Sequence, residues 1–144
     1  MKFILILSVL ILPYTAQAII VCPEIFGSYT CGEESPVQLT VWQYENNDNV
    51  MIYEMFNNTF TADGIKYLVL DNQNIKIEKK AECDYEKLHT YQRVYNKSND
   101  TTSVKRDVIS RLSPSKFLYE TVTTIIQSPY PDRDFKREMT CKLN

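Results

Sequence analysis

Alternation of apolar and polar residues with a period of two runs through most of this chain, and this feature most restricts the fold. In "KFLYETVTTII", residues 116–126, Phe117, Tyr119 and Ile125 fall on one face and Leu118 falls on the other. This spacing is typical of β-strands, whereas an amphipathic helix repeats its apolar residues every three or four positions. No segment beyond the apolar start of the chain sustains the helical spacing. The sequence therefore predicts an all-β protein.

Short polar turns separate the alternating segments. "NNDN" at 46–49, "DG" at 63–64 and "KSNDT" at 97–101 have the residue types that tight turns require. Many short strands with short connections are typical of a sandwich or a barrel, and strands with two usable faces favour the barrel. We predict an antiparallel up-and-down β-barrel of eight to nine short strands. The expected strands are 25–31, 37–44, 50–56, 65–70, 75–83, 87–96, 103–112, 116–126 and 135–141, with 60–62 as a further candidate.

The start of the chain has the pattern of a secretory signal. Lys2 is followed by the apolar run "FILILSVLIL" at 3–12 and by the small-residue end "AQA" at 16–18. The run is shorter than the roughly 20 residues that a membrane-spanning helix needs. A membrane-spanning β-barrel needs an uncharged lipid-facing band, and the charges within strands such as "IKIEKK" leave none. We predict that residues 1–18 are a cleaved signal peptide and that 19–144 form one domain. The product is then periplasmic or extracellular, without stable membrane insertion.

The charge of the exported part is weak. The leader contains one lysine and no acid, so 15 Lys and Arg remain against 18 Asp and Glu, a formal net charge of −3. A protein that binds nucleic acid is expected to have a strong excess of Lys and Arg over Asp and Glu. The composition therefore indicates no nucleic-acid partner.

All four cysteines, Cys22, Cys31, Cys83 and Cys141, lie after the leader. An even number of cysteines in an oxidising compartment predicts two disulfides. Their separations of 9, 52 and 58 residues match neither the close pairs of zinc sites nor a C-x-x-C redox motif. We therefore expect disulfides, with no metal and no cofactor, and three connectivities are open.

No catalytic arrangement stands out in the sequence. His89 is the only histidine, so a catalytic triad or a multi-histidine site has at most one base. Gly27, Gly32 and Gly64 lie too far apart to form a phosphate-binding loop. The sequence therefore indicates a binding protein rather than an enzyme.

Aromatic and methionine side chains on several strand faces are candidates for a ligand pocket. Such a lining suits an adaptable apolar pocket, and it equally suits a filled core. Alternation also places a polar group around His89 on one face of its strand, which could receive a carboxylate or hydroxyl or could form ordinary cross-strand pairs. The candidate pocket residues are Trp42, Tyr44, Tyr53, Met55, His89, Tyr91 and Arg93.

The stretch "FGSYTC" at 26–31 resembles the Gly-x-Trp element that opens lipocalin-type barrels, with Tyr in place of Trp. The leader, the later "ADG" at 62–64 and the cysteine positions also resemble small exported bacterial lipocalin-like (calycin-type) proteins. The chain departs from lipocalins in its short length and in lacking a C-terminal helix. The resemblance implies that Gly27 and Tyr29 close one end of the barrel, with Arg137 of the last strand over the Tyr29 ring. It implies a secreted protein that binds a small apolar or amphipathic ligand.

Closure of such a barrel would pair the first and last strands antiparallel. That pairing would place Cys22 near Cys141 and leave Cys31 for Cys83. The other two connectivities stay open at this point.

A second resemblance suggests a different function. Tyr29-Thr30-Cys31 is similar to the Tyr-x-Cys element that opens small periplasmic lysozyme inhibitors, although their downstream Ser-Gly-x-x-Tyr pattern is absent. The alternative prediction is therefore a protein-interaction module that binds a protein partner through a loop such as "SPYPDRD" at 128–134.

Overall fold

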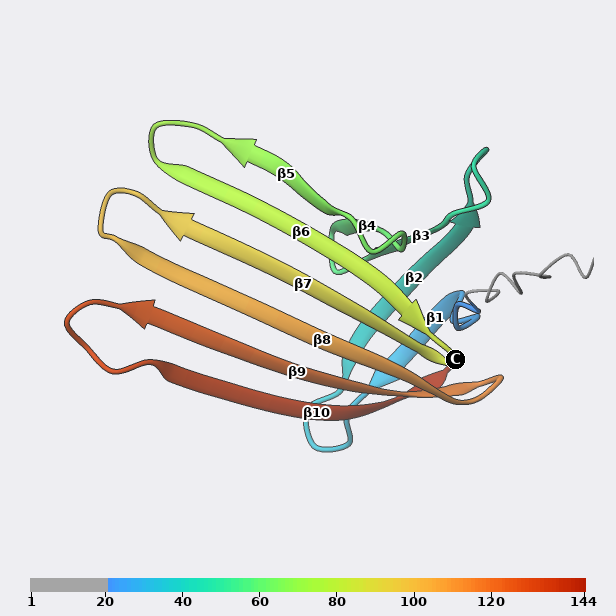
Figure 1. Cartoon of the computed structure of the whole chain (residues 1–144). Helices are drawn as coiled ribbons and strands as arrows, with labels where there is room; N and C mark the ends of the chain where they lie inside the picture. The colour runs from blue at the N-terminus through green and yellow to red at the C-terminus, as the bar shows by residue number, and fades with distance from the viewer. Residues whose placement is uncertain (1–20) are drawn as a thin grey trace, which may run out of the picture.

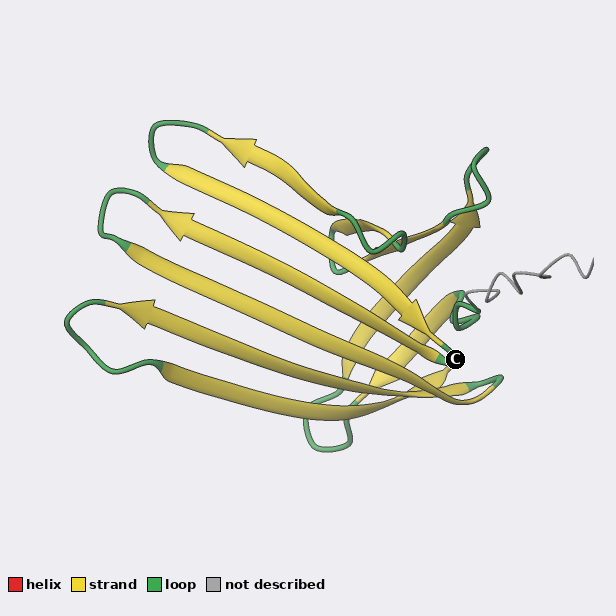
Figure 2. Ribbon diagram, in the orientation of Figure 1, coloured by secondary structure: helices red, strands yellow, loops and turns green. Residues whose placement is uncertain are grey.

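The computed structural model describes residues 21–144, so the predicted signal peptide lies outside the described residues. This part of the chain consists of strands and loops without a helix (Figure 2). No helix in residues 21–144 is long and apolar enough to cross a membrane. The ten strands are β1 (Gly27–Cys31), β2 (Val37–Glu45), β3 (Met51–Met55), β4 (Asn58–Thr61), β5 (Lys66–Asp71), β6 (Ile75–Asp84), β7 (Lys87–Asn96), β8 (Thr101–Ser113), β9 (Lys116–Gln127) and β10 (Arg133–Leu143).

All ten strands belong to one antiparallel sheet, in the order β4-β3-β2-β1-β10-β9-β8-β7-β6-β5. Strands β5–β10 form a broad curved layer, and β1–β4 curl over one end of it (Figure 1). The curl brings β4 into contact with β6. The molecule is therefore a curled half-barrel, which confirms the all-β antiparallel prediction.

The prediction of a closed barrel with eight to nine strands is wrong, because β4 and β5 do not pair. The first and last strands do pair, with Tyr29 opposite Leu143. The opening lies instead at the "ADGI" segment, residues 62–65. There Gly64 N–H donates to the carbonyl of Ala81 on β6, at 2.8 Å, and Ala62 N–H donates to Met51 on β3, at 2.9 Å. Because of these bonds, the segment crosses from the side of β3 to the side of β6 and does not form a hairpin. β4 and β5 are therefore the two edges of the sheet.

The core fills the end of the half-barrel that β2–β4 cover. Tyr29, Tyr53 and Phe117 are its largest fully buried side chains. The Tyr29 ring packs edge-on against Phe117 with centroids 4.7 Å apart, and the Tyr53 hydroxyl donates to the Pro23 carbonyl at 2.8 Å. Burial of one such aromatic side chain is worth about 1.5–3 kcal/mol. The other members of the cluster are Ile25, Cys31, Leu39, Val41, Met55, Phe60, Ala62, Ala81, Leu88, Ile109, Tyr119, Met139 and Cys141.

Both disulfides form, but the predicted pairing is wrong. Cys31 is bonded to Cys141, and Cys22 is bonded to Cys83. The start of β1 does lie beside the end of β10, but β1 begins only at Gly27, so Cys22 precedes the strand. Cys31 is therefore the cysteine in register with Cys141. Two disulfides are typical of exported proteins.

Gly27 occupies a position that other residues fit poorly. Its φ is +138°, and a Cβ there would lie 2.6 Å from Cδ1 of Leu143. We expect Gly27→Ala to lower the free energy of unfolding by about 2 kcal/mol, because alanine adds backbone strain and displaces the leucine. Urea unfolding measures this change. The matched control is Ser28→Ala at the next, exposed position of β1, and equal stability of the two variants would contradict the prediction.

Candidate binding surface

The outer halves of the long strands extend beyond the part of the sheet that β1–β4 cover (Figure 1). One row of side chains crosses them in register, from Leu70 through Ile77, Val94 and Ser103 to Ile125. Alternation places this row on the concave side, the side of the core. Phe135 of β10 lies in the adjacent row, opposite Thr123, and it is 56% exposed. We call Leu70, Ile77, Val94, Ser103, Ile125 and Phe135 the open face.

Strand β5 borders the open face and forms one free edge of the sheet. All six of its residues are exposed, and β6 is its one hydrogen-bonded neighbour. Apolar residues dominate it, since Leu68, Val69, Leu70 and the preceding Ile65 are 41–58% exposed. A register irregularity between Leu68 and Leu70 interrupts the ladder with β6, as bulges near sheet edges often do. An exposed apolar edge is a template on which another strand can pair.

A buried polar network lies between the core and the open face. Asp107 of β8 is buried on the concave side and accepts hydrogen bonds from Thr90 Oγ1 at 3.1 Å and from the Tyr119 hydroxyl at 3.0 Å. Lys105 Nζ lies 3.3 Å from Asp107 Oδ2 and also lies over the rings of Phe56 and Tyr119, 5.3 and 5.8 Å from their centroids. The Asp107 carboxylate therefore has both hydrogen-bond and ion-pair partners. Through Lys105, the network also connects the end of β3 with β7–β9.

The charges of this network alter two pKa values. Burial raises the pKa of the Tyr119 hydroxyl, and the Asp107 carboxylate raises it further. Burial acts to lower the pKa of Lys105, but contacts with Tyr119 and Asp107 outweigh it, so the pKa of this lysine is raised. Both shifts favour the state in which Lys105 is charged and Tyr119 is neutral.

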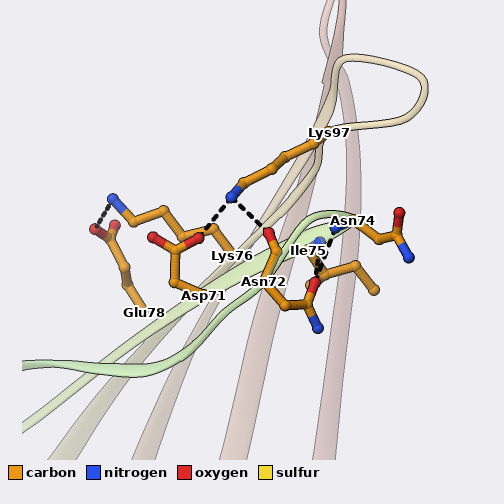
Figure 3. A network of polar contacts seen from close by, with 7 residues as sticks. All are labelled: Asp71, Asn72, Asn74, Ile75, Lys76, Glu78 and Lys97. Carbon is orange, nitrogen blue, oxygen red and sulfur yellow. Dashed lines mark hydrogen bonds and ion pairs between the residues drawn. The ribbon is translucent and has the colours of Figure 1, made fainter.

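A second polar network holds the outer ends of β5–β8 together (Figure 3). Lys97 Nζ, from the β7–β8 turn, lies 2.5 Å from Asp71 Oδ1 and donates to the Asn72 carbonyl at 2.6 Å. Asn72 Oδ1 accepts the backbone N–H groups of Asn74 and Ile75 at 2.9 and 2.8 Å. The contact with Lys97 lowers the pKa of Asp71. The hairpin tips beside the open face are thus joined across strands.

The seven predicted pocket residues lie in three separate places. Tyr53 and Met55 are buried in the core, where they fill space rather than line an internal pocket. Trp42 and Tyr44 lie on the outer side of β2 and are 55% and 46% exposed. A groove of about 490 Å³ nevertheless has both Trp42 and Met55 among its lining residues.

The remaining three predicted residues share the convex face of β7, as alternation indicated. His89, Tyr91 and Arg93 follow one another at every second position of this strand. His89 and Tyr91 line a hollow of about 480 Å³. Arg93 lines a neighbouring hollow near Lys97.

The expected contact between Arg137 and Tyr29 is not formed. Tyr29 is buried, and its partner ring is Phe117. Arg137 pairs with Thr121, six positions along β10 from Leu143, the residue opposite Tyr29. Six residues of a strand span roughly 20 Å. The resemblance to a lipocalin therefore fails at this pair.

Two features of the surface were not singled out from the sequence. The uninterrupted apolar run "YLVL" at 67–70 could have indicated an unusual edge strand. Asp107 shares its strand face with Ser103, Lys105 and Arg111, while Val104, Val108 and Leu112 share the other face, so alternation alone would have placed this carboxylate outside. In residues 21–144 no group of three or more His, Cys, Asp or Glu side chains could hold a metal ion.

Comparison of the chain with protein-family models, with curated proteins and with solved structures found no match.

Proposed function

We propose that the protein is an exported binding protein whose partner is another polypeptide. The partner covers the open face and adds a strand to the free edge of β5. The observation that carries the proposal is β5 itself, an apolar strand exposed along its whole length beside an uncovered sheet face. Strand addition uses main-chain hydrogen bonds for affinity and alternate side chains for specificity.

The packing of the molecule favours a protein partner over a small ligand inside the barrel. Tyr29, Tyr53 and Phe117 are fully buried and fill the covered end with side chains. Small-molecule sites are concave and bury most of the ligand, whereas the open face is a broad strand surface that extends to an edge. Protein interfaces typically bury roughly 800 Å² on each partner, an extended area rather than an enclosed pocket.

Site-specific photo-crosslinking tests the proposal. A photoreactive residue at Val69 on β5 is compared with one at Leu112 on β8, since both side chains are 53% exposed. We expect the Val69 probe, and not the Leu112 probe, to crosslink one polypeptide from the medium in which the protein is exported. A purified cell-wall lysozyme is the first defined partner to test, because the Tyr29-Thr30-Cys31 element suggested it.

Once crosslinking has identified the partner, its affinity is measured for the double variant Leu68→Lys/Leu70→Lys. We expect at least a tenfold loss of affinity, because two charges enter the apolar contact, with unfolding stability within about 0.5 kcal/mol of the parent. Val37→Lys on β2, another exposed apolar position, is the control. Unchanged affinity in the β5 variant, or equal crosslinking from Val69 and Leu112, would overturn the proposal.

A small amphipathic ligand is the second candidate function. The groove that contains Trp42 and Met55 supports it, since Phe56 adds an apolar wall while Glu54 and Asn57 add polar groups. Trp42 is the only tryptophan, so its fluorescence reports directly on this groove. A saturable change with a lipophilic probe, lost in Met55→Ala, is the expected result. No change over the probe's soluble range would remove this candidate.

A further inference from the structure

A row of cationic side chains crosses the convex face of the sheet, on the side opposite the open face. Lys66 of β5 pairs with Lys80 of β6, Lys80 pairs with Tyr91 of β7, and Tyr91 pairs with Arg106 of β8. The four side chains are therefore direct cross-strand neighbours on four successive strands. They line a hollow of about 480 Å³, together with His89.

Tyr91 lies between two of these cations. Lys66 Nζ is 5.7 Å from the centroid of its ring, and Arg106 Cζ is 5.9 Å from it. A cation at this distance is attracted by the ring face, so the ring holds both side chains over the hollow. The aromatic ring thereby positions two positive charges that would otherwise move apart.

The charges of this row are poorly compensated within the described part of the chain. Lys80 forms an ion pair of 2.6 Å with Glu82, but no ion pair in residues 21–144 includes Lys66 or Arg106. Other lysines of the sheet do have acidic partners, as Lys105 has in Asp107. Like charges directly opposite each other destabilise a sheet. The Tyr91 ring holds two of these cations in place, but within residues 21–144 only Lys80 of the three has an acidic partner at ion-pair distance.

We propose that this hollow binds a doubly charged tetrahedral oxyanion, namely inorganic phosphate, a phosphate monoester or free sulfate. The hollow is lined by three cations, Lys66, Lys80 and Arg106, and by two acids, Glu82 and Asp107. The Asp107 carboxylate is already paired with Lys105 on the concave side, so the cations exceed the remaining carboxylate, Glu82, by two positive charges, which matches a dianion. The guanidinium of Arg106 can donate two parallel hydrogen bonds to such a group, and Lys66 and Lys80 supply point charges. The Tyr91 hydroxyl adds a neutral donor. The site goes beyond the proposed protein-binding function, because it occupies the other face of the sheet.

Titration of the folded protein with inorganic phosphate and with sulfate tests the site, by calorimetry and by NMR shifts of His89 and Tyr91. We expect saturable binding that Arg106→Gln and Lys66→Gln each weaken about tenfold, since each removes a charged hydrogen-bond donor. Lys142→Gln, an exposed lysine near the end of β10, is the matched control and should bind like the parent. At one fixed phosphate concentration, the melting temperature of the parent and of the control should rise more than that of Arg106→Gln.

Vesicles distinguish the source of the anion. Vesicles of phosphatidic acid, whose headgroup is a phosphate monoester, are compared with phosphatidylcholine vesicles. Competition with phosphate by the phosphatidic acid vesicles alone assigns the site to a lipid headgroup, and absence of competition assigns it to a soluble anion. Either result supports the site provided that Arg106→Gln weakens the binding. The proposal is overturned if neither ions nor anionic vesicles bind, or if Arg106→Gln and Lys66→Gln bind as well as Lys142→Gln.

Discussion

Replacing both Cys31 and Cys141 with serine is expected to lower the free energy of unfolding by about 5 kcal/mol. The two cysteines are 110 residues apart in the chain, and they lie directly opposite each other on β1 and β10. A crosslink of this length restricts the unfolded chain strongly, and the chain-entropy model gives about 4.8 kcal/mol for it. Since a domain of this size is stable by only about 5–15 kcal/mol, the loss would be a large part of the total.

Because of its position, loss of this disulfide should also weaken the junction between β1 and β10. β1 and β10 form the junction between β2–β4 and the broad layer of β5–β9. Without the crosslink, the junction depends on the short ladder in which Tyr29, Thr30 and Cys31 pair with β10. We therefore expect β1–β4 to exchange their amide hydrogens faster than β6–β9 in the serine variant.

Urea unfolding of the double-serine variant, with matched hydrogen exchange, measures both effects. The double-serine variant at Cys22 and Cys83 is the control, because its disulfide encloses 61 residues and ties β6 to the segment before β1. It should lose a comparable free energy without the selective exchange of β1–β4. A loss below about 1 kcal/mol at Cys31 and Cys141 would contradict the argument from loop closure.

The strands were predictable because alternation is a local property. The run 116–126 lies within β9 (Lys116–Gln127), and the possible strand at 60–62 overlaps the end of β4 (Asn58–Thr61). What could not be read locally is where the sheet ends. The "DG" at 63–64 has the chemistry of a hairpin turn, but its backbone bonds join β6, and only the tertiary structure provides Ala81 as the acceptor.

The sequence also did not show which face of each strand points into the core. Alternation groups Trp42 with Tyr44 and opposes them to Leu39 and Val41, but it does not say which group points inward. In the structure Leu39 and Val41 are buried and Trp42 is exposed, so the aromatic residue that suggested a pocket lies outside. Register is equally non-local, which is why the four cysteines were recognised as disulfide residues while their pairing was wrong.

Asp107→Ala is expected to lower the free energy of unfolding by about 3 kcal/mol. The substitution leaves three groups without their acceptor: Thr90 Oγ1, the Tyr119 hydroxyl and the ammonium of Lys105. Removal of one partner from a buried ion pair costs about 3–5 kcal/mol, and the lower value applies because the Lys105 side chain is 36% exposed. Asp107→Asn retains an acceptor without the charge, so we expect an intermediate loss.

The pH dependence of stability separates loss of charge from loss of packing. The pKa values of Lys105 and Tyr119 are both raised in the folded protein. A raised pKa contributes stability below the ordinary value of the group, about 10 for both types, and this contribution is lost as the pH rises through the folded value. The parent should therefore lose stability above about pH 10. Asp107→Ala should lose less there, because the carboxylate that raises both pKa values is absent.

Urea unfolding at neutral and at alkaline pH measures both effects. Asp134→Ala is the matched control, because this aspartate is exposed on β10, and it should change stability by less than about 0.5 kcal/mol. The double variant Asp107→Leu/Lys105→Met should recover most of the loss, since it replaces the ion pair by apolar side chains and removes the unpaired ammonium. If Asp107→Ala were as stable as Asp134→Ala, or if the double variant were less stable than the single one, the carboxylate would not be what joins the core to the open face.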